Sequence, residues 1–440
     1  MGNGQPASAP AGILILLVLA TAFQSAAAGI IAGADLSHLS FFEGQGIAYK
    51  DGGQAQDALL MLKARGLTCV RLRLFTSSAA QAQADPYNYI NNLSYTLPLA
   101  QRVKAAGFQL MLDFHYSDTW ADPGHQRKPA AWTNLMFLQL VQQMKEYNSN
   151  TIAAFKNAGA MPDYVQIGNE ITSGVLWPDG RVGGSFDTPA QWAQLGQLLN
   201  AAIQGIKDAS GTLLPRVTVH IDRGGDWATT KWFFDQLGQQ KVPFDIIGES
   251  YYPFWHGPLA SLANCLTNAA LRYGKPIIVA ETGFPWTNSV WKTNIVGLAP
   301  SPEDQVAFLA ALAAVANSVP SGLGQGIIWW AAEYQKVNGL NEAGFDTTSF
   351  FNKDGSILPV ANAFGSLTLS PKLSAARDDA ILTLNWPLSL SGFYPATTTN
   401  LALNSAWLPL TNFIQTNRTG FALTLPITAG PCRFYRLQSN

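Results

Sequence analysis

The sequence predicts an α/β protein, a (β/α)8 TIM barrel with a small C-terminal all-β module. Eight apolar, β-rich runs alternate with amphipathic helical stretches between residues 30 and 334. Polar residues stand at the same end of run after run, as they do at the mouth of such a barrel. A doubly wound sheet is the structural alternative, and the lack of a Gly-rich phosphate turn after the first run disfavours it.

The elements of the barrel follow from hydrophobic periodicity. Strands of a parallel barrel are buried on both faces, which explains why the eight runs are almost continuously apolar. The strands are expected at residues 30–37, 68–75, 109–117, 163–170, 216–222, 244–252, 276–284 and 324–334. The helices are expected at residues 54–65, 95–106, 135–158, 189–209, 227–237, 259–273 and 302–317.

Beyond Ser370 the composition changes to short alternating segments separated by Ser, Thr, Asn and Gly turns. This pattern is typical of a small sandwich-like β module. We therefore expect the barrel to cover residues 29–370 and the module residues 371–440. The module is either a glycan-binding domain or a spacer, and the lack of an evident cluster of exposed aromatic residues favours the spacer. Its segments lie at residues 381–387, 400–406, 421–425 and 434–437.

Residues 1–28 are expected to be a signal peptide. An apolar segment at residues 12–23 is followed by small residues of the Ala-x-Ala kind at residues 24–28. The segment is too short to span a bilayer comfortably. The region before it lacks the Lys and Arg residues that are typical of a signal peptide. An uncleaved anchor is the alternative. Cleavage near Ala28 would leave a protein without membrane contact that is secreted, periplasmic or on the cell surface.

The composition excludes some classes of partner. Of the residues, 48% are hydrophobic and only 12% are charged, with a net charge of -1. Such a chain is not suited to nucleic acid or to an anionic membrane surface. The 13 Trp residues instead suit a site that stacks on sugar rings. Cys69, Cys265 and Cys432 fit neither a metal site nor a disulfide framework, and buried free thiols are expected.

Polar residues end the predicted strands, where burial would be costly unless they are paired or hydrogen-bonded. Their recurrence at one end of the strands predicts a shared polar pocket. Trp329 and Trp330 are adjacent, so only one of them can face this pocket while the other packs against helices. In strand order the polar residues are Arg71 and Arg73; Asp113, His115 and Asp118; Asn169 and Glu170; His220 and Asp222; Tyr251 and Tyr252; and Glu281.

Two of these residues, Glu170 and Glu281, suit the cleavage of a glycosidic bond. They end the fourth and seventh predicted strands, which face each other across a barrel. Retaining hydrolysis uses two carboxyl groups about 5 Å apart, one protonated as general acid and one ionised as nucleophile. Arg71 would keep Glu281 ionised through a charge-assisted hydrogen bond, and Tyr251 or Tyr252 would add a second donor. A lone Asn-Glu pair would more often be a helix cap, but the second carboxylate favours catalysis.

Six blocks of the sequence carry a resemblance to a known family. They are Gly33-Ala34-Asp35-Leu36-Ser37; Val70-Arg71-Leu72-Arg73-Leu74; Asp113-Phe114-His115-Tyr116-Ser117-Asp118-Thr119-Trp120-Ala121-Asp122-Pro123-Gly124; Gly168-Asn169-Glu170-Ile171 with Gly174 and Leu176-Trp177-Pro178; Ser250-Tyr251-Tyr252-Pro253-Phe254-Trp255-His256-Gly257; and Glu281-Thr282-Gly283-Phe284-Pro285-Trp286. The blocks run in order through nearly the whole barrel, and the third and the sixth are highly specific. They resemble the endo-β-1,4-galactanases of glycoside hydrolase family 53.

The resemblance implies a role for each matching residue. Glu170 would be the acid/base and Glu281 the nucleophile. The subsite that holds the sugar to be cleaved would be shaped by Arg71, His115, Asn169 and Trp330. The remaining substrate-binding residues would be Asp118, Trp120, Trp177, Tyr251, Tyr252, Trp255 and Trp286.

The sequence departs from the family at places that bear on the site. Trp330 is followed by Ala331-Ala332-Glu333-Tyr334, where the family usually continues Trp-Glu-Pro-Ala-Trp, so the subsites beyond the cleavage point are open. Glu249 replaces a smaller residue and is expected to be solvated or structurally paired rather than a third carboxylate of the pair. Residues 287–300 lack Asp and Glu, so the calcium site of some bacterial members is not expected. We expect no metal and no cofactor.

The sequence therefore predicts a monomeric, secreted enzyme that cuts β-1,4-galactan in pectic galactan and type I arabinogalactan by retaining double displacement. A related β-glycanase that acts on mannan or cellulose is one alternative, and parallel assays on the three polysaccharides separate them. A catalytically silent glycan-binding protein is the other. Glu170→Gln separates this one, because turnover should fall in an enzyme while binding of oligosaccharide persists.

Overall fold

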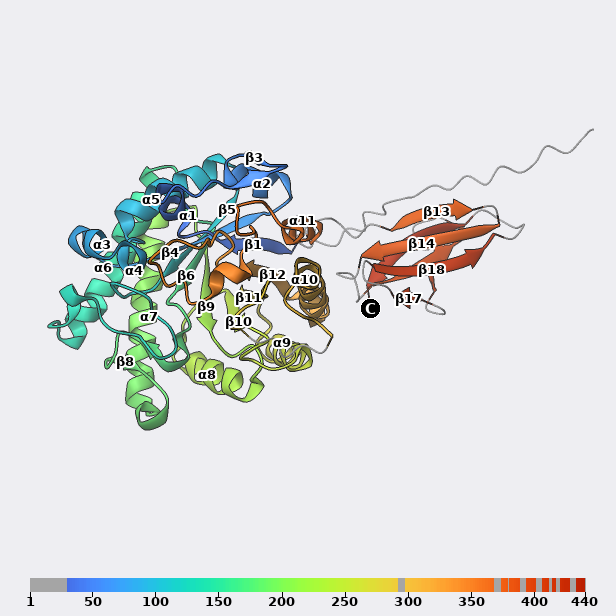
Figure 1. Ribbon diagram of the computed structural model, residues 1–440. Coiled ribbons are helices and arrows are strands. Elements are labelled where there is room, and N and C mark those ends of the chain that lie inside the picture. Colours follow the sequence, from blue (N-terminus) through green and yellow to red (C-terminus); the bar gives the residue numbers. More distant parts are fainter. Residues whose placement is uncertain are drawn as a thin grey trace, which may run out of the picture. The chain divides into compact units, whose positions relative to one another are not determined.

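The computed structural model describes residues 30–291, 297–367, 373–378, 380–387, 393–400, 406–410, 414–416, 420–427 and 433–439. Within these residues the chain forms two compact units, which divide at residues 369 and 370. Figure 1 labels the elements of each unit. The predicted signal peptide, the predicted boundary between barrel and module, Cys432 and most of the predicted strand at residues 400–406 lie outside the described residues.

The larger unit contains a closed barrel of eight parallel strands, which confirms the predicted fold class (Figure 1). The strand β1 (Ile31–Asp35) closes the barrel by pairing with both β4 (Cys69–Leu74) and β12 (Gly324–Trp329). The other strands are β5 (Gln109–Phe114), β6 (Tyr164–Ile167), β9 (Arg216–Ile221), β10 (Ile246–Tyr251) and β11 (Ile277–Thr282). β5 and β6 end before His115 and Asn169, which lie in the loops that follow, whereas Arg71, His220 and Glu281 lie within their strands.

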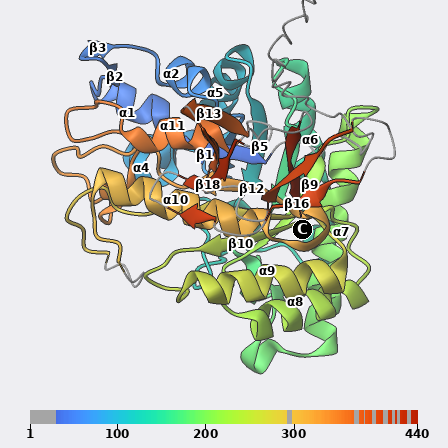
Figure 2. The same cartoon turned by 90° about the vertical axis from the view of Figure 1, so that its right-hand side faces the viewer.

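Helices surround the barrel, and α8 and α9 lie side by side among them (Figure 2). A helix overlaps each of the seven predicted ranges. These helices are α2 (Ala58–Ala64), α5 (Leu93–Ala105), α6 (Phe137–Asn157), α7 (Pro189–Ser210), α8 (Trp227–Gln239), α9 (Leu259–Tyr273) and α10 (Pro302–Asn317). The sequence does not predict α1 (Leu39–Gly44), α3 (Ala79–Ala84), α4 (Pro86–Tyr89) or α11 (Pro359–Ser366).

The prediction of one helix over residues 54–65 is wrong in its first part. Gln54 and Ala55 form a short strand, β3 (Gln54–Ala55), which pairs with β2 (Lys50–Asp51). The helix begins only at Ala58, because the Asp57 side chain accepts a hydrogen bond from the backbone N–H of Leu60 and caps it.

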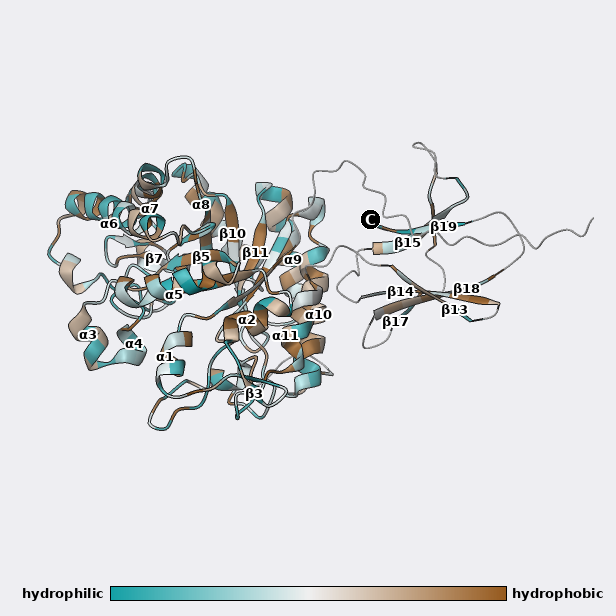
Figure 3. Cartoon of the chain, turned by 90° about the horizontal axis from the view of Figure 1, so that it is seen from above, coloured by the Kyte–Doolittle hydropathy of each residue, from teal (hydrophilic) through white to brown (hydrophobic). Residues whose placement is uncertain are grey.

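The inside of the barrel has an apolar floor and a polar layer above it. The floor is made of Ile31, Cys69, Met111, Tyr164, Ile246, Ile278, Ala280 and Ile328. Side chains two residues apart on a strand point to the same side, so Arg71, Asp113 and Gln166 follow directly above this floor. All three are fully buried. The alternate residues join the larger core, and Figure 3 shows β11 mostly in the colour of hydrophobic residues.

Several strands end in a turn with left-handed backbone. Tyr116 after β5, Glu170 after β6 and Ala331 after β12 have φ angles of 52°, 48° and 58°. This region costs a residue other than glycine about 1–3 kcal/mol. The strain falls on the end of the barrel that carries the polar residues, and at Glu170 it coincides with a contact to β10 described below.

The smaller unit is all-β, as predicted. Its first sheet has the order β13 (Ser374–Asp378), β14 (Ile381–Pro387), β18 (Gly420–Pro426) and β17 (Gln415–Thr416). Its second sheet has the order β16 (Leu408–Pro409), β15 (Phe393–Thr398) and β19 (Phe434–Ser439). Leu382, Leu384, Trp386 and Leu423 form the buried centre of this unit. The sequence does not predict β13, β15, β16 or β17.

Two further features concern the whole of the described chain. Cys69 and Cys265 are buried free thiols, as predicted. None of the helices among the described residues is long and apolar enough to cross a membrane.

Packing between α6 and α7 generates a first prediction. A Cβ atom added to Gly205 of α7 would lie 2.1 Å from the carbonyl oxygen of Lys145 on α6. Gly→Ala inside a helix normally stabilises by about 1 kcal/mol. Gly205→Ala should instead lower the free energy of unfolding by roughly 1–3 kcal/mol, because the two backbones must move apart.

The matched control is Gly238→Ala in α8, where an added Cβ atom has no neighbour within 4 Å. This change should raise the free energy of unfolding by about 0.5–1 kcal/mol. Urea unfolding followed by circular dichroism measures both variants. Equal gains in the two variants would contradict the close approach of α6 and α7.

Candidate active site

Arg71 is the centre of the polar layer inside the barrel. Its Nη1 atom lies 3.1 Å from Asp35 Oδ2 and 2.8 Å from Glu281 Oε1. Its Nη2 atom lies 2.8 Å from Asp113 Oδ2 and 2.8 Å from Asn169 Oδ1. The guanidinium therefore ties β1, β4, β5 and β11 to the turn after β6. Buried charges are tolerated in such a layer only because each is paired and hydrogen-bonded.

Glu281 at the end of β11 is stabilised as an anion. The side chain is almost fully buried, and besides Arg71 it has the Tyr252 hydroxyl, which donates a hydrogen bond to Oε2 at 3.3 Å. Burial raises the pKa of Glu281, and the negative charges of Asp113 and Asp35 add to the rise. The charge and the hydrogen bond of Arg71 oppose it, so the pKa of Glu281 stays raised but less so than that of Glu170. Both donors favour the charged form of the carboxyl group.

Glu170 after β6 is in the opposite situation. Its Oε1 atom lies 2.6 Å from Ser250 Oγ on β10. Burial raises the pKa of Glu170 well above its usual range, and the negative charges of Glu281 and Asp222 raise it further. Of the two glutamates, Glu170 is therefore the one that retains a proton, and Glu281 is the one held ionised.

A proton donor and an anion that face the same space form an acid–nucleophile pair. In the barrel order, β6 and β11 are separated by β9 and β10. The side chains nevertheless interact, since the charge of Glu281 is one cause of the raised pKa of Glu170. Two carboxyl groups whose environments push their pKa values apart can protonate a leaving oxygen on one side and attack carbon on the other.

The alternation of side chains along β10 decides which residues reach this pair. Ser250 and Tyr252 contact Glu170 and Glu281, respectively. Tyr251 points to the other side and is fully buried in the hydrophobic core, where its hydroxyl donates to a backbone oxygen of residue 257 at 2.7 Å. The prediction that Tyr251 binds substrate is therefore wrong, because its ring lies in the hydrophobic core on the side of β10 that faces away from the two glutamates.

Glu249 also points away from the pair. Its Oε2 atom accepts a hydrogen bond from the backbone N–H of Arg223 at 3.1 Å, and its Oε1 atom accepts one from the hydroxyl of Thr230 at 3.1 Å. Burial raises the pKa of Glu249 well above its usual range. Glu249 is thus structurally paired, as the sequence predicts.

His115 and Asn169 support Arg71 and its partners. The Nδ1 atom of His115 accepts a hydrogen bond from the backbone N–H of Ala121 at 2.9 Å, which leaves the proton on Nε2, 3.0 Å from Asp113 Oδ2. Burial lowers the pKa of His115, so the ring is neutral. Asn169 accepts from Arg71 and donates to the backbone oxygen of Ala121 at 2.8 Å. Both residues lie where the sequence places them, almost fully buried.

Aromatic rings line the space around the pair. Trp330 packs edge-to-face on Phe345, with ring centroids 4.1 Å apart, and lies 6.4 Å from Trp120. The Arg73 guanidinium stacks 4.5 Å above Trp120. Trp329 points the other way, and its ring packs on those of Phe308 in α10 and Phe364 in α11. This confirms that only one of the adjacent tryptophans faces the site.

A second aromatic group lies beside Tyr252. Trp255, with 54% of its surface exposed, packs against Tyr252 at 5.2 Å and against Trp291 at 5.0 Å. Trp286 lies on a neighbouring loop, and its indole N–H donates to the backbone oxygen of Asp346 at 3.3 Å. An exposed indole beside the tyrosine that contacts Glu281 is a surface on which the flat face of a sugar can stack.

Trp177 and Asp118 have contacts of a more structural kind. The indole N–H of Trp177 donates to the backbone oxygen of Ser173 at 2.8 Å, and Arg181 stacks on its ring at 4.3 Å. Asp118 accepts hydrogen bonds from the side chains of Thr76 and Gln81 at 2.7 and 3.0 Å. Both residues are half-buried, so they brace loops while keeping some surface open.

The sequence does not single out three residues that the structure adds to the site. Ser250 and Gln166 lie in strands, and alternation from their neighbours is the only sequence signal for them. Glu333 follows Trp330, and its Oε1 atom accepts a hydrogen bond from the backbone N–H of His38 at 2.8 Å. Burial and the charge of Asp35 raise the pKa of Glu333 to about 8.

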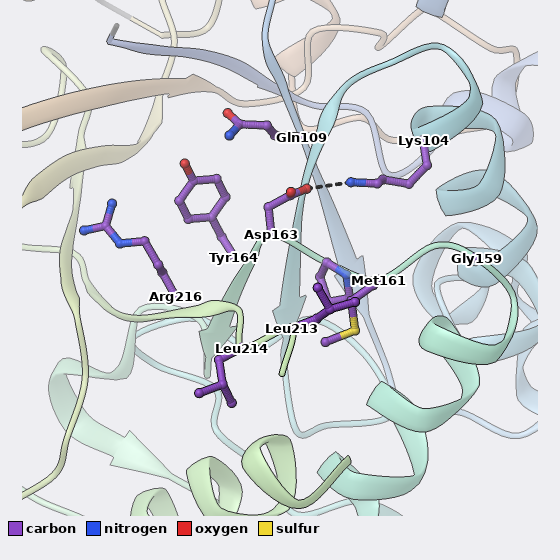
Figure 4. Close-up of a pocket in the computed structure, with 10 residues that line it drawn as sticks. Lys104, Gln109, Gly159, Met161, Asp163, Tyr164, Leu213, Leu214 and Arg216 are labelled. Atoms are coloured by element: carbon purple, nitrogen blue, oxygen red, sulfur yellow. Dashed lines mark hydrogen bonds and ion pairs between the residues drawn. The ribbon is translucent and has the colours of Figure 1, made fainter. Parts of the chain in front are cut away.

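A depression of about 450 Å³ lies at the opposite end of the barrel (Figure 4). Gln109 and Arg216, at the starts of β5 and β9, line it. Asp163 accepts hydrogen bonds there from Lys104 and from the backbone N–H of Leu110, both at 2.8 Å. Polar residues at this end of a barrel serve stability. Across the described part of the chain, no group of three or more His, Cys, Asp and Glu side chains is placed to hold a metal ion.

Comparisons with known proteins place this geometry in context. Residues 31–364 match the family model described as Glycosyl hydrolase family 53. The chain is 40% identical over 312 residues to an uncharacterised protein of Niallia circulans, covering 68% of this chain and 82% of that one. It is 34% identical to an arabinogalactan endo-β-1,4-galactanase of Thermothelomyces thermophilus, covering 76% and 98%. A solved catalytic domain of this family from Ignisphaera aggregans superposes with a TM-score of 0.70 at 31% identity, covering 82% and 100%.

Arg71 generates a prediction about stability. Arg71→Met leaves Asp35, Asp113 and Glu281 buried without the cation they share. We expect the free energy of unfolding to fall by about 3–5 kcal/mol. Arg102→Met is the matched control, because Arg102 pairs with two carboxylates at the surface and should lose at most about 1 kcal/mol. Similar losses in denaturant melts of the two variants would speak against a buried charge network.

Glu333 generates a prediction about pH. Its raised pKa means that the folded chain holds a proton that the unfolded chain has released. The resulting stabilisation is complete below the unfolded pKa of about 4.3 and is lost as the pH rises through about 8. Glu333→Gln should therefore flatten the fall of the melting temperature between pH 5 and pH 8, measured by calorimetry. Glu146→Gln on the exposed face of α6 is the control, and an unchanged slope in Glu333→Gln would refute the assignment.

Proposed function

The chain belongs to glycosyl hydrolase family 53, and on this premise we propose that it is an endo-β-1,4-galactanase that hydrolyses galactan with retention at the anomeric carbon. The observation that carries the proposal is the unequal environment of two facing glutamates. Arg71 and Tyr252 stabilise the anion of Glu281, whereas burial and neighbouring negative charge keep a proton on Glu170. The relative from Thermothelomyces thermophilus supports galactan as the substrate class.

The first half of the reaction uses the two glutamates in their resting states. Glu281 attacks the anomeric carbon while Glu170 gives its proton to the glycosidic oxygen, so the leaving sugar departs as a neutral alcohol. Arg71 and Tyr252 hold the attacking carboxylate in place. The product of this half is a sugar bound covalently to Glu281.

The second half requires Glu170 to become a base. Bond formation removes the negative charge of Glu281, and that charge is one of the causes of the raised pKa of Glu170. The pKa of Glu170 therefore falls in the covalent intermediate, and its carboxylate can take a proton from water. The water attacks the same face that the leaving group vacated, which gives retention.

The surroundings of the pair suit an uncharged polymer. Trp255 is exposed and Trp120 and Trp330 are half-buried, so each of the three has surface for sugar rings. A polysaccharide cannot enter a cell intact, and the apolar segment at residues 12–23 supports export of the enzyme. We propose that it acts outside the cytoplasm as a monomer.

Variants of three glutamates test the proposal. Glu170→Gln should lower kcat on galactan by roughly 10²- to 10⁴-fold while binding of galacto-oligosaccharide persists. Glu281→Gln removes the nucleophile and should lower kcat at least as far. Glu249→Gln is the matched control, because Glu249 is a buried glutamate of β10 that faces away from the pair and should leave kcat within about twofold of the original.

Release of reducing ends from galactan, mannan and cellulose measures these effects and the substrate preference together. Proton NMR during the first turnovers identifies the anomer formed, and the β anomer should appear first. Dominant activity on mannan or cellulose would overturn the substrate assignment. Unchanged turnover in Glu170→Gln would overturn the assignment of the acid.

A further inference from the structure

A buried row of hydrogen-bonding groups leads from Glu170 into the barrel. Ser250 Oγ lies 2.6 Å from Glu170 Oε1 and 2.9 Å from His220 Nε2. The other ring nitrogen, His220 Nδ1, lies 3.0 Å from Asn169 Oδ1 and 3.1 Å from Gln166 Nε2. Ser250 and His220 are fully buried. Each atom that joins one member of the row to the next therefore lies within hydrogen-bond distance of its neighbour, and these hydrogen bonds can be counted one by one.

Charged neighbours fix the orientation of the two amides. Asn169 turns its oxygen towards His220, because the same oxygen accepts a hydrogen bond from Arg71 at 2.8 Å. Gln166 turns its nitrogen towards His220, because the same nitrogen donates to Asp113 at 2.6 Å. His220 Nδ1 thus has an acceptor on one side and a donor on the other. It can be satisfied either with or without a proton.

His220 itself is neutral. Burial lowers its pKa well below the usual range, and the charge of Arg71 lowers it further, against the opposing effect of Asp113. A neutral imidazole carries one proton, on Nδ1 or on Nε2. The position of that proton decides the direction of every hydrogen bond in the row.

One tautomer fits an ionised Glu170. The Ser250 hydroxyl then donates to the carboxylate, and its oxygen accepts from His220 Nε2–H. His220 Nδ1 carries no proton and accepts from Gln166. The second N–H of Gln166 continues to donate to Asp113.

The other tautomer fits a protonated Glu170. The carboxylic acid then donates to Ser250, and the Ser250 hydroxyl donates to His220 Nε2. His220 Nδ1 carries the proton and donates to Asn169. Gln166 loses the imidazole as an acceptor, but the backbone oxygen of Gly168 and Asn169 Oδ1 both lie 3.2 Å from its nitrogen. Ser250, both ring nitrogens of His220 and the Gln166 amide nitrogen thus have a partner in both states, while Gln166 Oε1 is buried without one among the described residues. The change of charge stays on Glu170, and no charge appears on Ser250, His220 or the two amides.

We propose that Ser250 and His220 are positioning residues that let Glu170 alternate between acid and base by reversing the hydrogen bonds of this row. The inference rests on the proposed function, in which Glu170 changes its protonation state twice in each turnover. A cationic or fixed partner would favour one state of Glu170 and slow the other half of the reaction. A neutral histidine with a choice of tautomer holds the carboxyl group in one position in both states.

Other groups determine the pH at which Glu170 titrates. Glu281 on β11, Asp222 after β9 and Asp122 in the loop after β5 face it with negative charge. These residues raise the pKa of Glu170, and the hydrogen bond from Ser250 lowers it. The row determines which hydrogen bonds inside the barrel reverse when Glu170 loses its proton.

The tautomer of His220 is the direct test. The full chain is labelled with ¹⁵N-histidine, and its 5 histidines are assigned with single variants. Glu170 is followed in parallel through a ¹³C-labelled carboxyl group. As Glu170 loses its proton, the ring proton of His220 should move from Nδ1 to Nε2. The ¹⁵N chemical shift of Nδ1 should then become that of an unprotonated nitrogen, and the shift of Nε2 that of a protonated one. In Glu170→Gln this exchange should be absent. A ring proton that stays on one nitrogen while Glu170 titrates would overturn the proposal.

Variants of Ser250 give a kinetic test. Ser250→Ala breaks the row and should lower kcat by roughly 10- to 100-fold. It should also move the alkaline limb of the kcat/KM profile to higher pH, because a bond that lowers the pKa of Glu170 is lost. Ser250→Thr keeps the hydroxyl and should restore both properties. A loss of kcat at every pH without movement of the limb would indicate a merely structural role and would overturn the proposal.

The two proposals fail in different ways. If Glu170→Gln cleaves galactan at the original rate, the proposed function fails, whatever the tautomer of His220 does. If Glu170→Gln is inactive but the tautomer of His220 does not change with pH in the original chain, the proposed function stands and the reversible row is refuted.

Discussion

The cation of Arg71 lies between three buried carboxylates, those of Asp35, Asp113 and Glu281. Each carboxylate comes from a different strand, so the same guanidinium that balances their charge also joins the strands. Arg71 further binds the amide oxygen of Asn169 and thereby holds the turn that carries Glu170. Without this cation Asp113 and Glu281 would lose the arginine that pairs with them, whereas Asp35 would keep Arg73 at 3.2 Å.

The site divides its two tasks between two kinds of surroundings. Glu281 is fixed as an anion by a permanent charge, which suits a group that must attack in the same state in every cycle. Glu170 has neutral partners, Ser250 and His220, which suits a group that must gain and lose a proton. The charged neighbours of Glu170 are negative. One of these charges, that of Glu281, disappears when Glu281 forms a bond to the sugar.

The parts of the fold and site that depend on local pattern are predictable from the sequence. Apolar runs with polar ends give the eight strands, and the same ends give Glu170 and Glu281. Contacts across the barrel are not predictable, because which side chains meet depends on the stagger of the strands. The partnership of Ser250 with His220 is one example. Tyr251 is another, since the sequence does not say which of two adjacent tyrosines faces inward.

The central claim is that Glu170 holds its proton to higher pH than Glu281. A ¹³C NMR titration of glutamate carboxyl groups in the free enzyme measures both pKa values. The variants Glu170→Gln and Glu281→Gln each remove one resonance and so assign it. The account predicts that the resonance of Glu281 titrates at lower pH than that of Glu170, and that Glu281→Gln shifts the pKa of Glu170 downward. A titration of Glu281 at or above that of Glu170 would contradict it.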